Sequence, residues 1–119
     1  YPGTGARDET GVGNIVNVPL RPMSGGVQFR RAFTEIILPA LEDFRPDFLL
    51  VSAGFDAHRR DPLAQLMLED EDYGWVGERL MVVAAHHSRG RLVASLEGGY
   101  DLAALTTGSA AFVRSLMAA

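Results

Sequence analysis

Short apolar runs alternate along the chain with longer segments of helical periodicity, and this alternation constrains the fold more than any other feature. The runs indicate strands at residues 14–18, 47–53 and 91–96. Apolar residues at helical spacing indicate helices at 27–44, at 102–117, and between the acidic residues 69–72 and Gly90. Strands that alternate with helices in this order are typical of a parallel sheet. The sequence therefore predicts an α/β fold, a parallel sheet with helices on both faces.

Three local features refine this prediction. The uninterrupted apolar run 48–51 is typical of a strand that is buried on both faces. Pro39 removes a backbone donor inside the predicted helix 27–44, so we expect a kink there. Asp101 follows a Gly-Gly pair and precedes the last helix, where it is predicted to be the N-cap.

The composition excludes several classes of protein. The 119 residues fit one small domain or part of a larger one, with a net charge of −4 and 11 basic residues that are all arginine. This charge argues against general nucleic-acid binding, which needs clustered positive charge. Because cysteine is absent, any metal must be held by carboxylate, imidazole or carbonyl groups. No apolar run approaches the ~20 residues of a membrane helix, and no signal peptide is recognisable, so we expect a cytoplasmic protein.

The first residues suggest that the chain is a fragment. It starts without methionine, inside a glycine-rich loop that offers no element to anchor the end. We therefore expect residues 1–119 to be the C-terminal part of a single larger domain. A parallel strand at a severed edge exposes unpaired backbone groups and an apolar face, so the isolated chain is expected to associate, with a homo-oligomer as one outcome.

Two predicted strands end in unusual sequences. The first runs out through Ser52-Ala53-Gly54-Phe55-Asp56-Ala57-His58. The second runs out through Leu96-Glu97-Gly98-Gly99-Tyr100-Asp101. In open parallel sheets, ligands bind beyond the carboxyl ends of the strands. The strand order therefore brings Asp56 and Tyr100 to the same edge of the sheet, at the carboxyl ends of its strands. We call this edge the rim. From the residues alone this is an α/β protein with a candidate hydrolase site.

Four ordered motifs resemble one known family. VSAGFDAHRRDPL at 51–63 strongly resembles the histone deacetylase and acetylpolyamine amidohydrolase family, particularly its bacterial and class II-like members. YPGTG at 1–5, NVPL at 17–20 and LEGGYDL at 96–102 match the same family in the same order. Together these motifs cover essentially the whole chain.

The resemblance implies roles for individual residues. It implies that Asp56 is one of three protein ligands to a catalytic zinc and that Tyr100 is the catalytic tyrosine. It places Tyr1 in the channel for the acylated amine, and implies that Gly98 and Gly99 let the phenol approach the metal. It also places Asp61 and His58 close to the site without contact to the metal. In the family, the histidine that corresponds to His58 in this motif is not a metal ligand.

The resemblance also implies that the site is incomplete in this chain. The family's other zinc ligands, an Asp-x-His pair, and its histidine dyad would precede Tyr1. His86-His87 is not that dyad, because it stands at the C-terminal end of a predicted helix, where cations favour the dipole. The isolated chain is therefore expected to be inactive and to bind zinc weakly, since a zinc site takes three protein ligands.

Three functions remain open on the sequence. The first is a zinc-dependent deacetylase that acts on acyl-lysine or acetylpolyamines. The second is an arginase-type ureohydrolase, which would need closely paired aspartates, for which the loop offers only Asp56 and Asp61. The third is a non-catalytic binding module with the same fold. Glu97 and Asp101, beside Tyr100, could attract a cationic amine but are more simply solvated loop charges.

Overall fold

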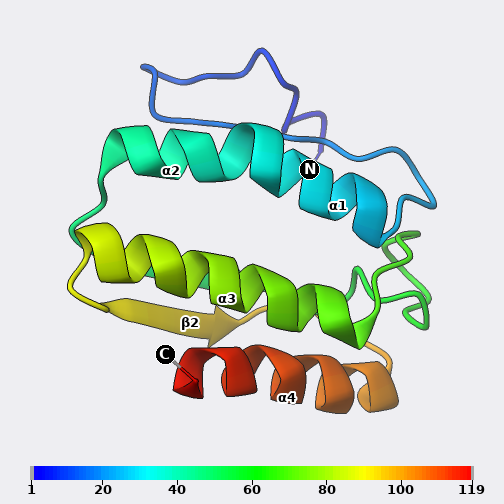
Figure 1. The fold of residues 1–119 in the computed structure, drawn as a ribbon. Helices are drawn as coiled ribbons and strands as arrows, with labels where there is room; N and C mark the ends of the chain where they lie inside the picture. Colours follow the sequence, from blue (N-terminus) through cyan, green and yellow to red (C-terminus); the bar gives the residue numbers. More distant parts are fainter. Residues whose placement is uncertain (1, 119) are drawn as a thin grey trace.

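The computed structural model describes residues 2–118, and a two-stranded parallel sheet organises them. The elements in chain order are α1 (Gly26–Ala32), the π-helical turn η1 (Phe33–Ile37), α2 (Leu38–Phe44), β1 (Leu49–Ala53), α3 (Asp70–His87), β2 (Leu92–Leu96) and α4 (Leu102–Met117) (Figure 1). In the sheet, Leu49 lies opposite Leu92 and Ala53 lies opposite Leu96. The parallel α/β class predicted from the alternation is therefore confirmed.

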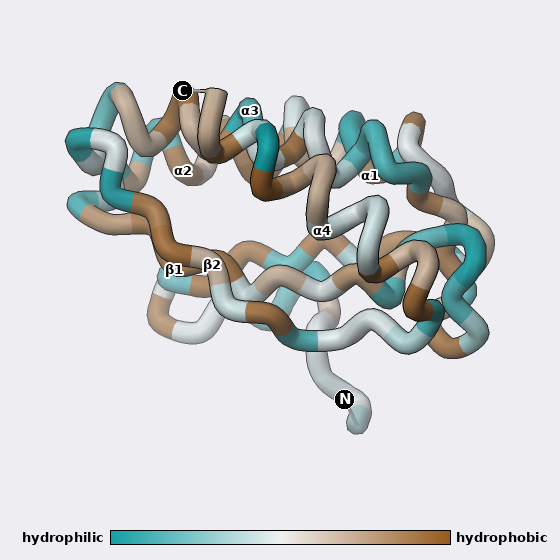
Figure 2. The backbone as a smooth tube through the Cα atoms, turned by 90° about the horizontal axis from the view of Figure 1, so that it is seen from below, coloured by the Kyte–Doolittle hydropathy of each residue, from teal (hydrophilic) through white to brown (hydrophobic). Residues whose placement is uncertain are grey.

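The described helices cover one face of this sheet. Leu49 is buried in one core cluster, and Val51 and Ala53 pack against a second, larger cluster. On the other face, Leu50 is 73% exposed and Val93 is 51% exposed. Figure 2 shows the hydrophobic colouring that runs along both strands. The prediction that the run 48–51 is buried on both faces is therefore wrong for the chain as described, because none of residues 2–118 packs over its outer side.

The core lies between the sheet and the helices. Its buried side chains come from the loops after β1 and from the facing sides of α3 and α4: Phe55, Leu68, Tyr73, Val76, Leu80 and Phe112. Phe55 stacks at a tilt on Tyr73, with 4.9 Å between ring centroids. This contact fixes the start of the loop that follows β1. Among the helices of residues 2–118, none is long and apolar enough to span a membrane.

The kink expected at Pro39 takes the form of the π-helical turn η1. Leu38 donates its N–H to the carbonyl of Phe33, five residues earlier. Pro39 has no N–H to donate, and in a regular α-helix its ring would clash with the carbonyl four residues before it. The wider turn accommodates that exclusion, and α1, η1 and α2 continue as one helical arm across the molecule (Figure 1).

The predicted strand at 14–18 is wrong. These residues form an irregular segment in which Ile15 is 43% and Val16 is 55% exposed. Ile15 donates its N–H to the carbonyl of Thr10, and the Asn17 side chain donates to the carbonyls of Ala6 and Glu9. Local turns therefore satisfy backbone polar groups that a strand would pair with a neighbouring strand. Within residues 2–118, no strand lies beside residues 14–18 to pair with them.

Candidate active site at the carboxyl ends of the strands

The two loops that follow β1 and β2 stay paired beyond the sheet. Glu97 donates its N–H to the carbonyl of Ala53 at 2.9 Å, and Phe55 donates to the carbonyl of Gly98 at 2.9 Å. Because the strands are parallel, both loops leave the sheet at the same edge. Asp56 and the turn that carries Tyr100 therefore lie on one rim, as the strand order predicted.

Asp56 places its carboxylate against Gly98. A Cβ atom built on Gly98 would lie 2.8 Å from both Cγ and Oδ2 of Asp56, so a larger residue there would displace the carboxylate. Asp56 is half-buried, and no hydrogen bond or ion pair to its carboxylate occurs within residues 2–118. Partly buried charges normally have partners. The Asp56 carboxylate is thus open to a cation or donor from outside this part of the chain.

A constrained turn carries Tyr100 two residues beyond Gly98, the residue that contacts this carboxylate. Gly99 has φ = 141°, a conformation that favours glycine. A Cβ atom at Gly99 would also lie 3.1 Å from Leu105 and 3.3 Å from Phe55. Tyr100 itself is 58% exposed, so its phenol is accessible at the rim.

Asp61 fixes the position of this turn from the other loop. Its carboxylate accepts hydrogen bonds from the backbone N–H of Leu63 at 2.9 Å and of Tyr100 at 2.8 Å. Asp61 is only 9% exposed. Since both oxygens are used in this way, Asp61 does not form with Asp56 the paired metal site that a ureohydrolase would need.

Replacing Asp61 with alanine should therefore loosen the turn that holds Tyr100. Two partly buried N–H groups would lose a charged acceptor, which is expected to destabilise the fold by roughly 1–3 kcal/mol. Urea unfolding would measure the loss, and hydrogen exchange of the Tyr100 amide should accelerate. Asp47→Ala is the matched control, because Asp47 is exposed. An unchanged Tyr100 exchange rate would contradict this role.

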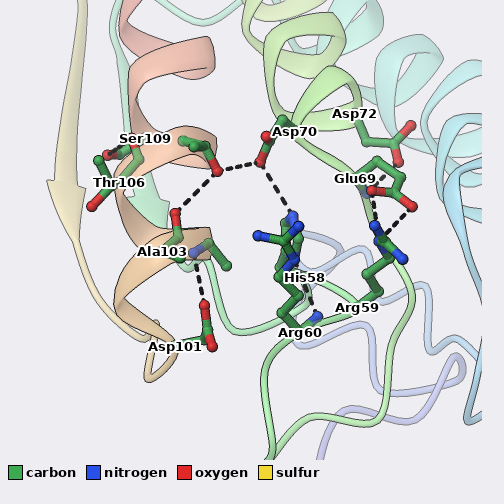
Figure 3. A network of polar contacts seen from close by, with 12 residues as sticks. His58, Arg59, Arg60, Glu69, Asp70, Asp72, Asp101, Ala103, Thr106 and Ser109 are labelled. Carbon is green, nitrogen blue, oxygen red and sulfur yellow. Dashed lines mark hydrogen bonds and ion pairs between the residues drawn. The ribbon is translucent and has the colours of Figure 1, made fainter.

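His58 is a buried connection between the loop and the helices. It is 3% exposed, and its Nδ1 accepts from the backbone N–H of Arg60 at 3.1 Å. Its Nε2 lies 3.2 Å from Oδ1 of Asp70, as Figure 3 shows, and the same oxygen accepts from the Thr107 hydroxyl at 2.8 Å. Both ring nitrogens are occupied, so His58 is not free to bind a metal here.

The helix termini around the rim differ in how well the sequence predicted them. The N-cap at Asp101 is confirmed: its carboxylate accepts from the backbone N–H of Ala104 at 2.8 Å. The acidic residues 69–72 mark the start of α3, as the sequence predicted. In the structure Asp70 binds His58, and buried Asp72 accepts from Arg30 at 2.8 Å and from the N–H of Glu69 at 2.9 Å. The contact between Glu69 and Asp72 is a local capping box. His58 and Arg30 are distant in sequence from their partners, and no local pattern identifies those two contacts.

Several carboxylates lie near the buried hydroxyl of Tyr73. Burial raises the pKa of Tyr73 well above its usual value, and the carboxylates of Asp56, Asp61, Asp72 and Asp70 raise it further. The Tyr73 hydroxyl is buried and has no hydrogen-bond partner among residues 2–118. A surrounding of this sign favours cations at the rim.

A metal at the rim would need ligands beyond Asp56. Within residues 2–118, the group of three or more potential metal ligands that the structure brings together is Glu42, His86 and His87. This group lies at the start of the strands, where α2 ends before β1 and α3 ends before β2, and so away from Asp56. The predicted channel residue Tyr1 falls outside the described residues.

Comparisons with known proteins identify the family to which this fold belongs. The histone deacetylase domain family matches residues 1–116. A rice protein named histone deacetylase 10, chloroplastic, is 43% identical over 98% of the chain and 27% of its own length. A probable deacetylase of Methanothermobacter thermautotrophicus is 44% identical over 98% of the chain and 35% of its own length. The crystal structure of the HDA15 HD domain superposes with a TM-score of 0.91 at 36% identity, over 99% of this chain and 34% of that one.

The fold and the rim define a parallel α/β unit with an open carboxylate at the strand ends. With the family match over nearly the whole chain, they show that the chain belongs to the histone deacetylase family. The chain spans about a third or less of the length of the relatives it matches.

Proposed function

We propose that this chain is part of a zinc-dependent amidohydrolase that removes acetyl or related acyl groups from lysine side chains or polyamines. The observation that carries the proposal is the half-buried Asp56 carboxylate, which lies against Gly98 without a hydrogen bond or ion pair from residues 2–118. Family membership supports a hydrolase of the deacetylase type.

The residues at the rim fit one side of a zinc site. Asp56 would supply one carboxylate ligand, and the remaining ligands and the histidine dyad are proposed to come from the part of the domain before Tyr1. When bound, the metal would lower the pKa of a water molecule and polarise the amide carbonyl. Asp61 and His58 would hold the two rim loops in position without contact to the metal.

Tyr100 would stabilise the transition state through its hydroxyl. The carbonyl oxygen of the amide gains negative charge as water attacks, and a neutral phenol can donate a hydrogen bond to it. A phenol stays protonated near neutral pH, since its usual pKa is about 10. Gly98 and Gly99 keep the turn close to Asp56, so that both groups can reach one substrate, with Tyr1 proposed in the channel.

The negative surroundings of the rim support a cationic substrate. An acetylpolyamine keeps protonated amines along its chain, and the carboxylates around the rim would attract them. An acylated lysine side chain is neutral, so it would gain nothing from this attraction. We propose no nucleic-acid or membrane partner.

The proposal predicts that residues 1–119 alone do not hydrolyse acetyl-lysine peptides. One carboxylate does not make a zinc site, which takes three protein ligands plus water. The complete domain, meaning this chain joined to the part of the deacetylase domain proposed to precede Tyr1, should be active and should lose activity to a chelator. Parallel assays of both forms on one fluorogenic acetyl-lysine peptide would measure this.

Two outcomes would contradict the proposal. An inactive complete domain that still binds acetyl-lysine would favour the non-catalytic binding module. Submicromolar zinc binding by residues 1–119 that disappears in Asp56→Asn would show that the rim is more complete than we propose.

A further inference from the structure

A second cluster of metal-binding side chains lies at the amino ends of the strands. Nε2 of His87 lies 2.6 Å from Oε2 of Glu42, and Nδ1 of His86 lies 3.8 Å from Oε1 of Glu42. One ligand atom from each residue lies within 4.8 Å of the other two. The Glu42 carboxylate therefore bridges two imidazoles, with one oxygen directed to each.

The structure around this cluster holds its two helices firmly together. Ser88, which ends α3, is fully buried and donates its hydroxyl to the carbonyl of Pro46 at 2.6 Å. Val83 and Ala84 of α3 are buried against Leu38 and Leu41 at the start and middle of α2. The backbones that carry Glu42 and the two histidines are thus already in place before any ligand binds.

The distances suit a small divalent ion after minor side-chain movement. Zinc bonds to histidine nitrogen and carboxylate oxygen at about 2.0–2.2 Å, so tetrahedral ligand atoms lie about 3.4 Å apart. The side chains of Glu42 and His86 are 42% and 61% exposed, which leaves them free to adjust.

We propose that Glu42, His86 and His87 form a second metal site, which binds zinc or a similar transition-metal ion and cross-links α2 to α3. Two imidazoles and one carboxylate favour such ions over magnesium or calcium, which prefer oxygen ligands. Water would complete the coordination, because the site opens to solvent. The site is separate from the rim of Asp56, and the proposal does not depend on the proposed hydrolase function.

Zinc titration of residues 1–119, followed by calorimetry and by NMR of the imidazole protons, tests the site. The chain has three histidines, so buried His58 provides an internal control. We expect one zinc per chain, with shifts of the His86 and His87 signals and none of His58. Loss of a residue that merely supports a ligand costs ~10–100-fold in metal affinity, so Glu42→Gln and His86→Ala should each weaken binding by at least about tenfold.

A matched variant tests whether zinc binding depends on this cluster. Asp43→Asn removes an exposed neighbouring carboxylate and should leave the zinc affinity unchanged. Circular dichroism would verify that each variant is folded. The proposal is overturned if zinc does not bind saturably, or if binding is insensitive to Glu42→Gln and His86→Ala. In that case the three residues form an ion pair only.

Discussion

Replacing Asp56 with asparagine should reduce deacetylation by the complete domain by about 1000-fold or more. Metal stabilisation of the developing charge is worth several kcal/mol, and each 1.36 kcal/mol corresponds to a tenfold change in rate. Asparagine keeps the shape that fits against Gly98 but removes the charge that would hold the metal. The measurement is kcat/KM on an acetyl-lysine peptide, together with zinc content by atomic absorption.

The control for this variant is Asp47→Asn. Asp47 is exposed and lies just before the amino end of β1, so the same chemical change there should leave both activity and zinc content unaltered. Asp56→Asn should keep the fold, because no hydrogen bond or ion pair within residues 2–118 depends on that carboxylate. Wild-type activity in Asp56→Asn would show that Asp56 is not a metal ligand.

Replacing Tyr100 with phenylalanine should lower kcat by roughly 100- to 1000-fold, the usual effect of losing one oxyanion donor. The hydroxyl is proposed to act only in the transition state, so KM should change little. The backbone N–H of Tyr100, which binds Asp61, is untouched by this substitution. Steady-state kinetic assays of the complete domain, with zinc content measured in parallel, would distinguish a lower rate of the chemical step from a loss of bound zinc.

Tyr73→Phe provides the matched control, since it also removes one phenolic hydroxyl. The Tyr73 hydroxyl is buried without a partner among residues 2–118, and removing an unsatisfied polar group is neutral or stabilising. Its activity should therefore equal that of the wild type. Equal activity losses in both variants, or a Tyr100→Phe effect confined to KM, would contradict the proposed role of Tyr100.

The helices and strands that pack against the core could be predicted from the sequence. The last helix was predicted with the bounds that α4 has, and β1 and β2 lie within the predicted runs. In each case a regular apolar face coincides with local capping or turn residues, so local and tertiary preferences agree. The strand predicted at 14–18 failed because β-branched composition indicates a strand only where a neighbour completes the backbone pairing.

The candidate site was predictable in its location but not in its contacts. Strand order alone brings Asp56 and Tyr100 to one edge, because parallel strands share their carboxyl ends. The bond from Tyr100 to Asp61 joins residues 39 apart in the sequence, and the bond from His87 to Glu42 joins residues 45 apart. Such pairs depend on how the helices are placed in space, and periodicity carries no information about that placement.

The most direct test of the account is the location of zinc in crystals of the complete domain. Anomalous diffraction at the zinc absorption edge would locate the ion without reference to activity. The account predicts a zinc peak about 2.0–2.2 Å from a carboxylate oxygen of Asp56, the usual bond length for this ligand, with the Tyr100 phenol facing it. Zinc-loaded crystals without a peak at Asp56 would contradict it.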